Sequence, residues 1–141
     1  MRRMVTLLCT LFLSLCLFAC EGTTDNAVID YGDSAIFSKS EIKSAISAVL
    51  EDFKEYKDCD LVKLRYNDAM YLDHLEMYMT YGRGSVNGIG KENVIILLGE
   101  FNVGKNADPY FAGESVTNWK WILTRKSAVD DWIIDDAGWA W

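Results

Sequence analysis

The stretch SKSEIKSAISAVLEDFKEY, residues 38–56, is the part of the chain with the clearest helical periodicity. Its apolar residues recur at spacings of three and four and therefore share one face. They are Ile42, Ala45, Ile46, Val49, Leu50, Phe53 and Tyr56. Ser38 and Glu41 have the spacing of a capping box, in which each side chain accepts a hydrogen bond from the backbone amide of the other residue. The stretch predicts an amphipathic helix with one buried stripe.

Most of the chain after this helix has the patterns of β-strands. Residues 61–66 alternate between two faces, as in a half-buried strand. Residues 94–98 are apolar throughout, which indicates a central strand covered by the helix on one side. Residues 118–126 alternate again, and residues 131–135 return antiparallel to them after a short turn. Residues 69–81 fit both a helix and a strand, and we favour a short helix.

These elements predict a single α+β domain over residues 38–141. In it, the N-terminal helix packs across a curved, mainly antiparallel sheet of four or more strands. Residues 21–37 are rich in Thr, Asp, Asn and Gly and are interpreted as a short polar linker. The aspartates at 25, 30 and 33 do not have the alternating spacing of an EF-hand loop, so calcium binding is not predicted there.

The beginning of the chain has the pattern of an export signal. Arg2 and Arg3 precede an uncharged run over residues 4–19, which is shorter than the roughly 20 apolar residues of a membrane-spanning helix. The run ends in the sequence LFAC, residues 17–20, which resembles the lipobox of bacterial lipoproteins. We therefore interpret residues 1–20 as a lipoprotein signal peptide that is cleaved before Cys20. The alternative is an ordinary secretory signal in which this cysteine is incidental.

The resemblance to a lipobox implies a location and a partner. Cys20 would become the first residue and carry a diacylglyceryl group, whose two acyl chains give stable membrane attachment. The mature protein is then expected at the extracytoplasmic face of a bacterial cell membrane, held there by its lipid anchor.

Net charge argues against a nucleic-acid partner. The formal net charge is −7, and it becomes −9 once the two arginines of the leader are set aside. Phosphate binding needs a basic surface, which this composition does not provide.

The chain from residue 38 to 141 resembles a family of small uncharacterised lipoproteins, mainly from Firmicutes. The resemblance is carried by the helix with Ile42 and Val49, by the run VIILL at residues 94–98, and above all by the sequence NWKWIL at residues 118–123. It implies a cystatin-like or nuclear-transport-factor-2-like domain, a cone-shaped α+β fold with one open end. The resemblance implies no particular activity.

Aromatic side chains are the candidate ligand-binding residues. Trp119 and Trp121 project to the same side of the predicted strand over residues 118–126, and Tyr66 ends the strand over residues 61–66. A row of large aromatic rings on a concave sheet could hold an apolar or sugar-like ligand. The alternative for the two tryptophans is packing in the core against the helix.

No catalytic residue, metal ligand or cofactor site is predicted. His74 is the only histidine, and Asp73 cannot easily orient it because adjacent residues point in different directions. Cys59 has no histidine near it in the sequence and is expected to be a small buried apolar residue. Four aspartates flank residues 132–134 and are interpreted as solvated turn residues: Asp130, Asp131, Asp135 and Asp136.

These observations favour a non-enzymatic, membrane-tethered domain that binds a small molecule or a protein through the open end of its sheet. Two alternatives stay open. A small cone-shaped enzyme, such as an isomerase, dehydratase or hydrolase, would need acid and base groups inside its cavity. An envelope interaction or immunity protein would need an exposed apolar or acidic patch in place of a deep pocket.

Overall fold

The computed structural model describes residues 21–107 and 110–139. The five strands are β1 (Val28–Asp30), β2 (Cys59–Arg65), β3 (Val94–Val103), β4 (Ser115–Thr124) and β5 (Ile133–Gly138). The helices are α2 (Lys39–Asp52), α3 (Asp68–Tyr81) and the short 3-10 helices η1 (Phe53–Glu55), η2 (Arg83–Ser85) and η3 (Lys91–Asn93).

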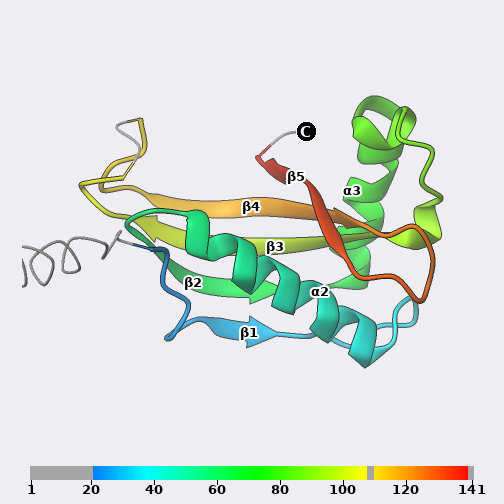
Figure 1. The fold of residues 1–141 in the computed structure, drawn as a ribbon, viewed down its shortest axis with the longest axis horizontal. Coiled ribbons are helices and arrows are strands. Elements are labelled where there is room, and N and C mark those ends of the chain that lie inside the picture. Colours follow the sequence, from blue (N-terminus) through cyan, green and yellow to red (C-terminus); the bar gives the residue numbers. More distant parts are fainter. Residues whose placement is uncertain (1–20, 108–109, 140–141) are drawn as a thin grey trace, which may run out of the picture.

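The strands form one sheet in the order β1-β2-β3-β4-β5 (Figure 1). β1 pairs with β2 in parallel, and every other pair is antiparallel. The predicted α+β fold with a mainly antiparallel sheet is therefore confirmed. All three antiparallel pairs contain a register irregularity, a feature that bends strands and increases their twist.

α2 begins and packs as its sequence predicts. The amide of Glu41 donates to the Ser38 hydroxyl at 3.3 Å, and the amide of Ser38 donates to the Glu41 carboxylate at 2.8 Å, which completes the capping box. Its buried residues are Ile42, Ala45, Ile46 and Val49, and the stripe continues into Phe53 of η1. The helix lies across one face of the sheet (Figure 1).

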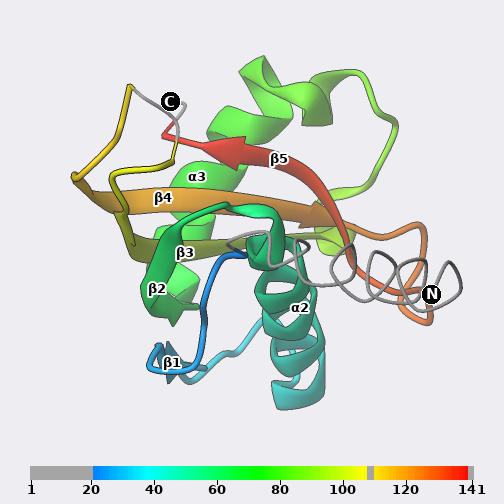
Figure 2. The ribbon, with the colours of Figure 1, turned by 60° about the vertical axis from the view of Figure 1, so that its left-hand side comes forward.

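Residues 69–81 form a helix, as we favoured, and α3 covers the other face of the sheet (Figure 2). Asn67 caps its start, accepting at 3.1 Å from the amide of Met70. Three side chains on one face of α3 are buried: Tyr71, Leu75 and Tyr78.

β3 is the middle strand, and residues 94–98 are all buried, which confirms the prediction for this run. Neighbouring residues of a strand point to opposite faces. Ile96 therefore faces α3, and Leu97, paired with Trp121, faces α2. Both faces of the centre of the sheet are core because each one has a helix over it.

The interpretation of residues 21–37 as a linker needs correction, because part of this segment belongs to the sheet. Val28, Ile29 and Asp30 pair with Lys63, Leu64 and Arg65 of β2. Further upstream, the amide of Thr23 donates to the Cys59 carbonyl at 2.8 Å. A strand of three residues is too short to show an alternating pattern, so the sequence gives no sign of it.

Gly99 in β3 provides a test of the packing between sheet and helix. A Cβ at this position would overlap the Trp121 ring and lie 3.1 Å from the Lys63 carbonyl oxygen. Trp121 is fully buried, so its ring is enclosed by other core residues and cannot easily move away. We expect Gly99→Ala to lower the free energy of unfolding by roughly 1–3 kcal/mol, the usual effect of overpacking, as measured by urea denaturation.

The control for this prediction is the same substitution in a Trp121→Leu background. Leu removes the ring that the new methyl group would meet, so the loss caused by Gly99→Ala should shrink there. An equal loss in both backgrounds would show that the Trp121 ring is not the obstacle.

Candidate functional site

A cavity of about 330 Å³ opens at the end of the sheet where α2 stops. It lies between η1, the start of β2, the end of β3, the start of β4 and the residue that follows β5. Apolar and aromatic side chains form most of its walls: Tyr56, Phe101, Phe111, Val116, Trp119 and Trp139. We call this cavity the aromatic pocket.

The rings of the aromatic pocket hold one another edge to face. Trp119 is central, with its ring centroid 5.3 Å from Trp139, 5.6 Å from Phe101 and 6.4 Å from Tyr56. Phe111 completes the wall at 5.4 Å from Trp139. This arrangement is favourable for aromatic pairs and fixes the shape of the pocket without a ligand.

An irregularity in β4 places Val116 and Trp119 on the same wall. Gly99 pairs with Trp119 and Phe101 pairs with Val116, so β4 takes three steps where β3 takes two. Asn118 lies inside this bulge with φ 55°, in the left-handed region that asparagine tolerates better than most residues. Residues three apart in a regular strand would point to opposite faces.

Trp139 closes the wall from the far end of the chain. It follows Gly138, whose partner in β4 is Lys120. Its indole nitrogen donates to the Thr117 carbonyl at 2.8 Å, while 47% of the residue is exposed. The ring is therefore held at the rim, with one side toward the pocket and the other toward solvent.

The Tyr56 hydroxyl is kept in its neutral form. Burial raises the pKa of Tyr56, the charge of Asp52 raises it further, and the indoles of Trp121 and Trp119 offset part of the rise. Among the described residues, neither indole nitrogen makes a hydrogen bond of ordinary geometry, and both are shielded from solvent. This phenol is not poised to act as a base at neutral pH.

Cys59 lies in the pocket wall as a neutral thiol. It is buried, and its sulfur donates to the Lys57 carbonyl at 3.5 Å. Burial raises the pKa of Cys59, and the neighbouring charges of Asp58 and Asp60 add to the rise. A protonated, shielded thiol is a poor nucleophile, so this wall offers apolar contact.

The three residues predicted to bind a ligand have different surroundings in the structure, and only one of them lines the pocket. Trp119 lines the aromatic pocket, whereas Trp121 is fully buried beneath Phe53, with ring centroids 6.3 Å apart. Trp119 and Trp121 do lie together, 6.5 Å apart. Tyr66 is buried elsewhere, against Phe37, and its hydroxyl donates to Asp68 at 2.7 Å.

Sequence reasoning predicted only Trp119 among the six wall residues named above and missed the other five: Tyr56, Phe101, Phe111, Val116 and Trp139. The helical pattern assigns Tyr56 to the buried stripe, whereas the structure leaves it partly buried at the pocket. Phe111 and Trp139 lie in a loop and beyond the last strand, where no periodicity indicates which way a side chain points. The available signal in the sequence is that each is a large apolar ring among mostly polar neighbouring residues.

His74 lies on α3, which covers the face of the sheet opposite to α2. Burial lowers the pKa of His74, the charge of Lys120 lowers it further, and Asp73 acts weakly in the other direction. Within residues 21–107 and 110–139 no carboxylate is hydrogen-bonded to it. The imidazole has no partner that would make it a catalytic base in this conformation.

The aspartates near the last strand have different partners. Asp135 accepts from the Tyr78 hydroxyl at 2.5 Å and lies 3.5 Å from the Arg83 Nε, so it ties β5 to the end of α3. Asp130 accepts from the Ser127 hydroxyl at 2.7 Å within the turn. In the described part of the chain, no three His, Cys, Asp or Glu side chains are grouped to hold a metal ion.

Three buried tyrosines, two within α3 and one just before it, make the fold sensitive to alkaline pH. Burial raises the pKa of Tyr66, Tyr71 and Tyr78, that of Tyr71 to about 12, and nearby carboxylates add to each rise. Unfolded tyrosines ionise near pH 10. The neutral phenols therefore stabilise the fold fully below about pH 10, and this contribution is lost as the pH rises through the folded pKa values.

We expect the melting temperature, followed by circular dichroism, to fall steeply between about pH 10 and 12. Tyr71→Phe should make this fall shallower because it removes one of the groups that must ionise. Tyr81→Phe, at an exposed position, serves as the control. An identical pH profile for all three proteins would contradict the assignment to Tyr71.

A comparison with protein families, curated proteins and solved structures found no match for this chain. The predicted signal peptide and the lipidation site at Cys20 lie outside the described residues. Within the described ranges, no helix is both long enough and apolar enough to cross a membrane.

Proposed function

We propose that this chain is a lipid-anchored protein of the extracytoplasmic face of a bacterial membrane, and that it binds a small apolar molecule in the aromatic pocket. The observation that carries the binding function is the pocket itself, about 330 Å³ with walls of interlocked aromatic rings. Pockets of this size and lining are typical of small-molecule sites.

The polar groups of the pocket favour binding over catalysis. The Cys59 thiol and the Trp139 indole already donate to backbone carbonyls, and the Tyr56 phenol is held neutral. Among the described lining residues, the charged ones are one acid, Glu55, and one base, Lys57. A ligand held mainly by its apolar surface would leave all these interactions in place.

The anchoring part of the proposal is supported by the sequence LFAC at residues 17–20. A helix lying across a mainly antiparallel sheet is compatible with a cystatin-like or nuclear-transport-factor-2-like domain, and we propose this assignment together with the lipoprotein family that the sequence resembles. In domains of this shape, an opening at one end of the sheet is a natural place for a ligand.

The test is to extract the full-length protein from bacterial membranes into lipid nanodiscs and identify co-purifying small molecules by mass spectrometry. We expect the wild type to retain an apolar compound, with membrane lipids included among the candidates. Phe111→Ala, which opens the pocket wall, should lower its amount several-fold. Tyr81→Ala, which removes an exposed aromatic ring from α3, should leave it unchanged.

Equal amounts of every apolar compound, membrane lipids included, in all three preparations would refute binding in the aromatic pocket. The anchor is tested separately by incorporation of radiolabelled palmitate. We expect label in the wild type and none in Cys20→Ser, and equal labelling of the two would refute the lipidation site.

A further inference from the structure

The first described residues lie against the elements that form the aromatic pocket. The amide of Gly22 donates to the Lys54 carbonyl at 3.0 Å, and a Cβ on Gly22 would overlap the Phe53 carbonyl oxygen. The next residue, Thr23, bonds to the backbone of Cys59, which lines the pocket. The N-terminal segment is therefore fixed beside the pocket wall.

This attachment limits how far a lipid on Cys20 can be from the pocket. Cys20 is two positions before Gly22, and an extended chain spans at most about 7 Å over those two steps. Acyl chains on Cys20 would therefore enter the bilayer next to η1. The end of the domain that carries the pocket is the end that the anchor holds at the membrane.

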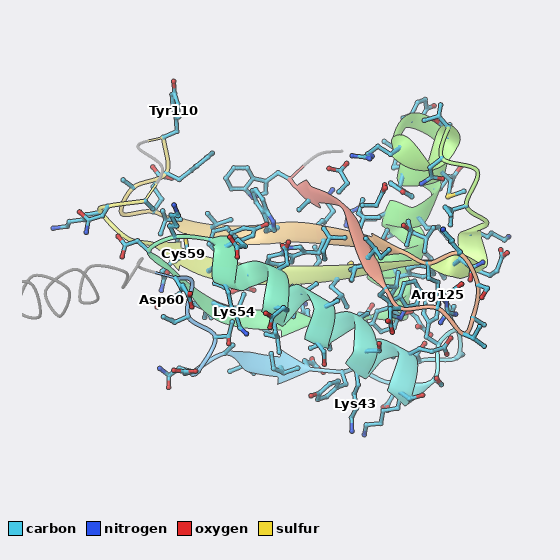
Figure 3. All side chains as sticks on the ribbon, in the orientation of Figure 1. Lys43, Lys54, Cys59, Asp60, Tyr110 and Arg125 are labelled. Atoms are coloured by element: carbon cyan, nitrogen blue, oxygen red, sulfur yellow. The ribbon has the colours of Figure 1, made fainter. Side chains whose placement is uncertain are left out.

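The same end of the molecule presents aromatic side chains to the surroundings. Figure 3 shows Tyr110 projecting from the β3–β4 loop at the end where Lys54, Cys59 and Asp60 also lie. Tyr110 is 86% exposed, and Trp139 at the pocket rim is 47% exposed. Tyr and Trp are the residues that favour the boundary between lipid and water, where one side of the ring is apolar and the other is wet.

We infer that this end of the domain rests on the bilayer and that the aromatic pocket takes an acyl chain of a membrane phospholipid. This inference rests on the proposed function and names its ligand. An acyl chain needs no hydrogen-bond partner, which matches a pocket whose walls are mostly apolar and aromatic. Among the described lining residues, Glu55 and Lys57 balance each other in charge, so this part of the wall has no net preference for an ionic ligand.

The test uses the full-length acylated protein in phosphatidylcholine vesicles whose acyl chains are brominated near the middle. Bromine quenches tryptophan fluorescence on contact, so the quenched fraction reports which indoles touch these chains. We expect marked quenching of the wild type. Trp119→Phe and Trp139→Phe should each lower the quenched fraction, and the two substitutions combined should lower it about twofold. Trp132→Phe, in the core near Arg125, should not lower it.

A second pair of variants leaves the core untouched. Tyr110→Asp puts a charge on the exposed loop at the anchored end and should reduce quenching, whereas Tyr81→Asp, on α3 at the other end of the molecule, should not. Because both positions are exposed, loss of folding does not account for a difference between them.

The possible failures are distinguishable. In one outcome the protein floats with the vesicles, but either all tryptophan variants are quenched like the wild type or no protein is quenched. The acyl-chain inference is then wrong, and the proposed binding of another apolar molecule stands. Loss of quenching in Trp139→Phe alone would mean that only the rim touches lipid, which also overturns it. The protein's own acyl chains contain no bromine, so occupation by the anchor would give an unquenched Trp119 and refute a bilayer lipid as the ligand. Failure to float at all would refute the anchor itself.

Discussion

The Val49→Asp variant is expected to show no cooperative thermal unfolding transition. Val49 is completely buried in the stripe of α2 that faces the sheet. The substitution removes an apolar contribution of about 1.5–3 kcal/mol and places a carboxylate where it has no partner, which costs several kcal/mol more. Together these losses are comparable with the roughly 5–15 kcal/mol that holds a domain of this size together.

Thermal melts followed by circular dichroism check this prediction. Ser44→Asp is the matched control because it adds the same side chain to the exposed face of the same helix. It should melt cooperatively and close to the wild type. Phe53→Asp, at the end of the stripe, should behave like Val49→Asp. A normal melt for either buried variant would mean that the stripe is not part of the core.

The parts of the fold that the sequence predicts are those whose burial is periodic. The stripe of α2 and the apolar run of β3 are buried over several turns or residues, so their patterns are long enough to recognise. The capping box is likewise a local signal, completed by Ser38 and Glu41 alone. α3 was ambiguous because its exposed face also carries apolar residues, such as Leu72 and Met77, which blur a helical pattern.

Parts that depend on distant partners are not visible in the sequence. β1 has three residues and is a strand only because β2 lies beside it. In the site, strand alternation correctly placed Trp119 and Trp121 on one face. Strand alternation does not show how much of that face is covered by a helix. Phe53, the first residue of η1, covers Trp121. Trp119 lies beyond this covered part of the sheet and lines the aromatic pocket.

The Arg125→Ala variant is expected to lose about 2–3 kcal/mol of unfolding free energy, less than the roughly 3–5 kcal/mol lost when a fully buried ion pair is broken. The Arg125 guanidinium is buried and bonds to Glu41 at 2.6 Å and to the Asn93 side chain at 3.3 Å (Figure 3 labels Arg125). It also stacks 4.3 Å from the centre of the Trp132 ring. The end of β4 is thereby tied to the start of α2. The expected loss of unfolding free energy is this small because the Glu41 side chain is 28% exposed, so water can replace part of the lost interaction.

Urea denaturation of Arg125→Ala should be compared with that of Lys54→Ala. Lys54 also pairs with an acid of α2, Glu51 at 2.5 Å, but both side chains are largely exposed. Exposed pairs are screened by water, so we expect little change in the denaturation midpoint for Lys54→Ala. Equal effects of the two substitutions would show that the Arg125 interactions are worth no more than a surface ion pair.

Acid titration separates the contributions of Arg125 and Ser38 to the same carboxylate. The hydrogen bond from the Ser38 hydroxyl is the largest cause that lowers the pKa of Glu41, burial opposes it, and Arg125 lowers the pKa further. A lowered folded pKa means that the ionised carboxylate stabilises the fold above the unfolded pKa, and that this stability is lost as the pH falls through the folded value. We therefore expect Glu41→Gln to flatten the acid side of the stability profile and Arg125→Ala to flatten it only in part, because the Ser38 hydroxyl stays in place. If Arg125→Ala flattened the profile as fully as Glu41→Gln, the capping serine would contribute nothing to the ionisation of Glu41, and the order of these two causes would have to be reversed.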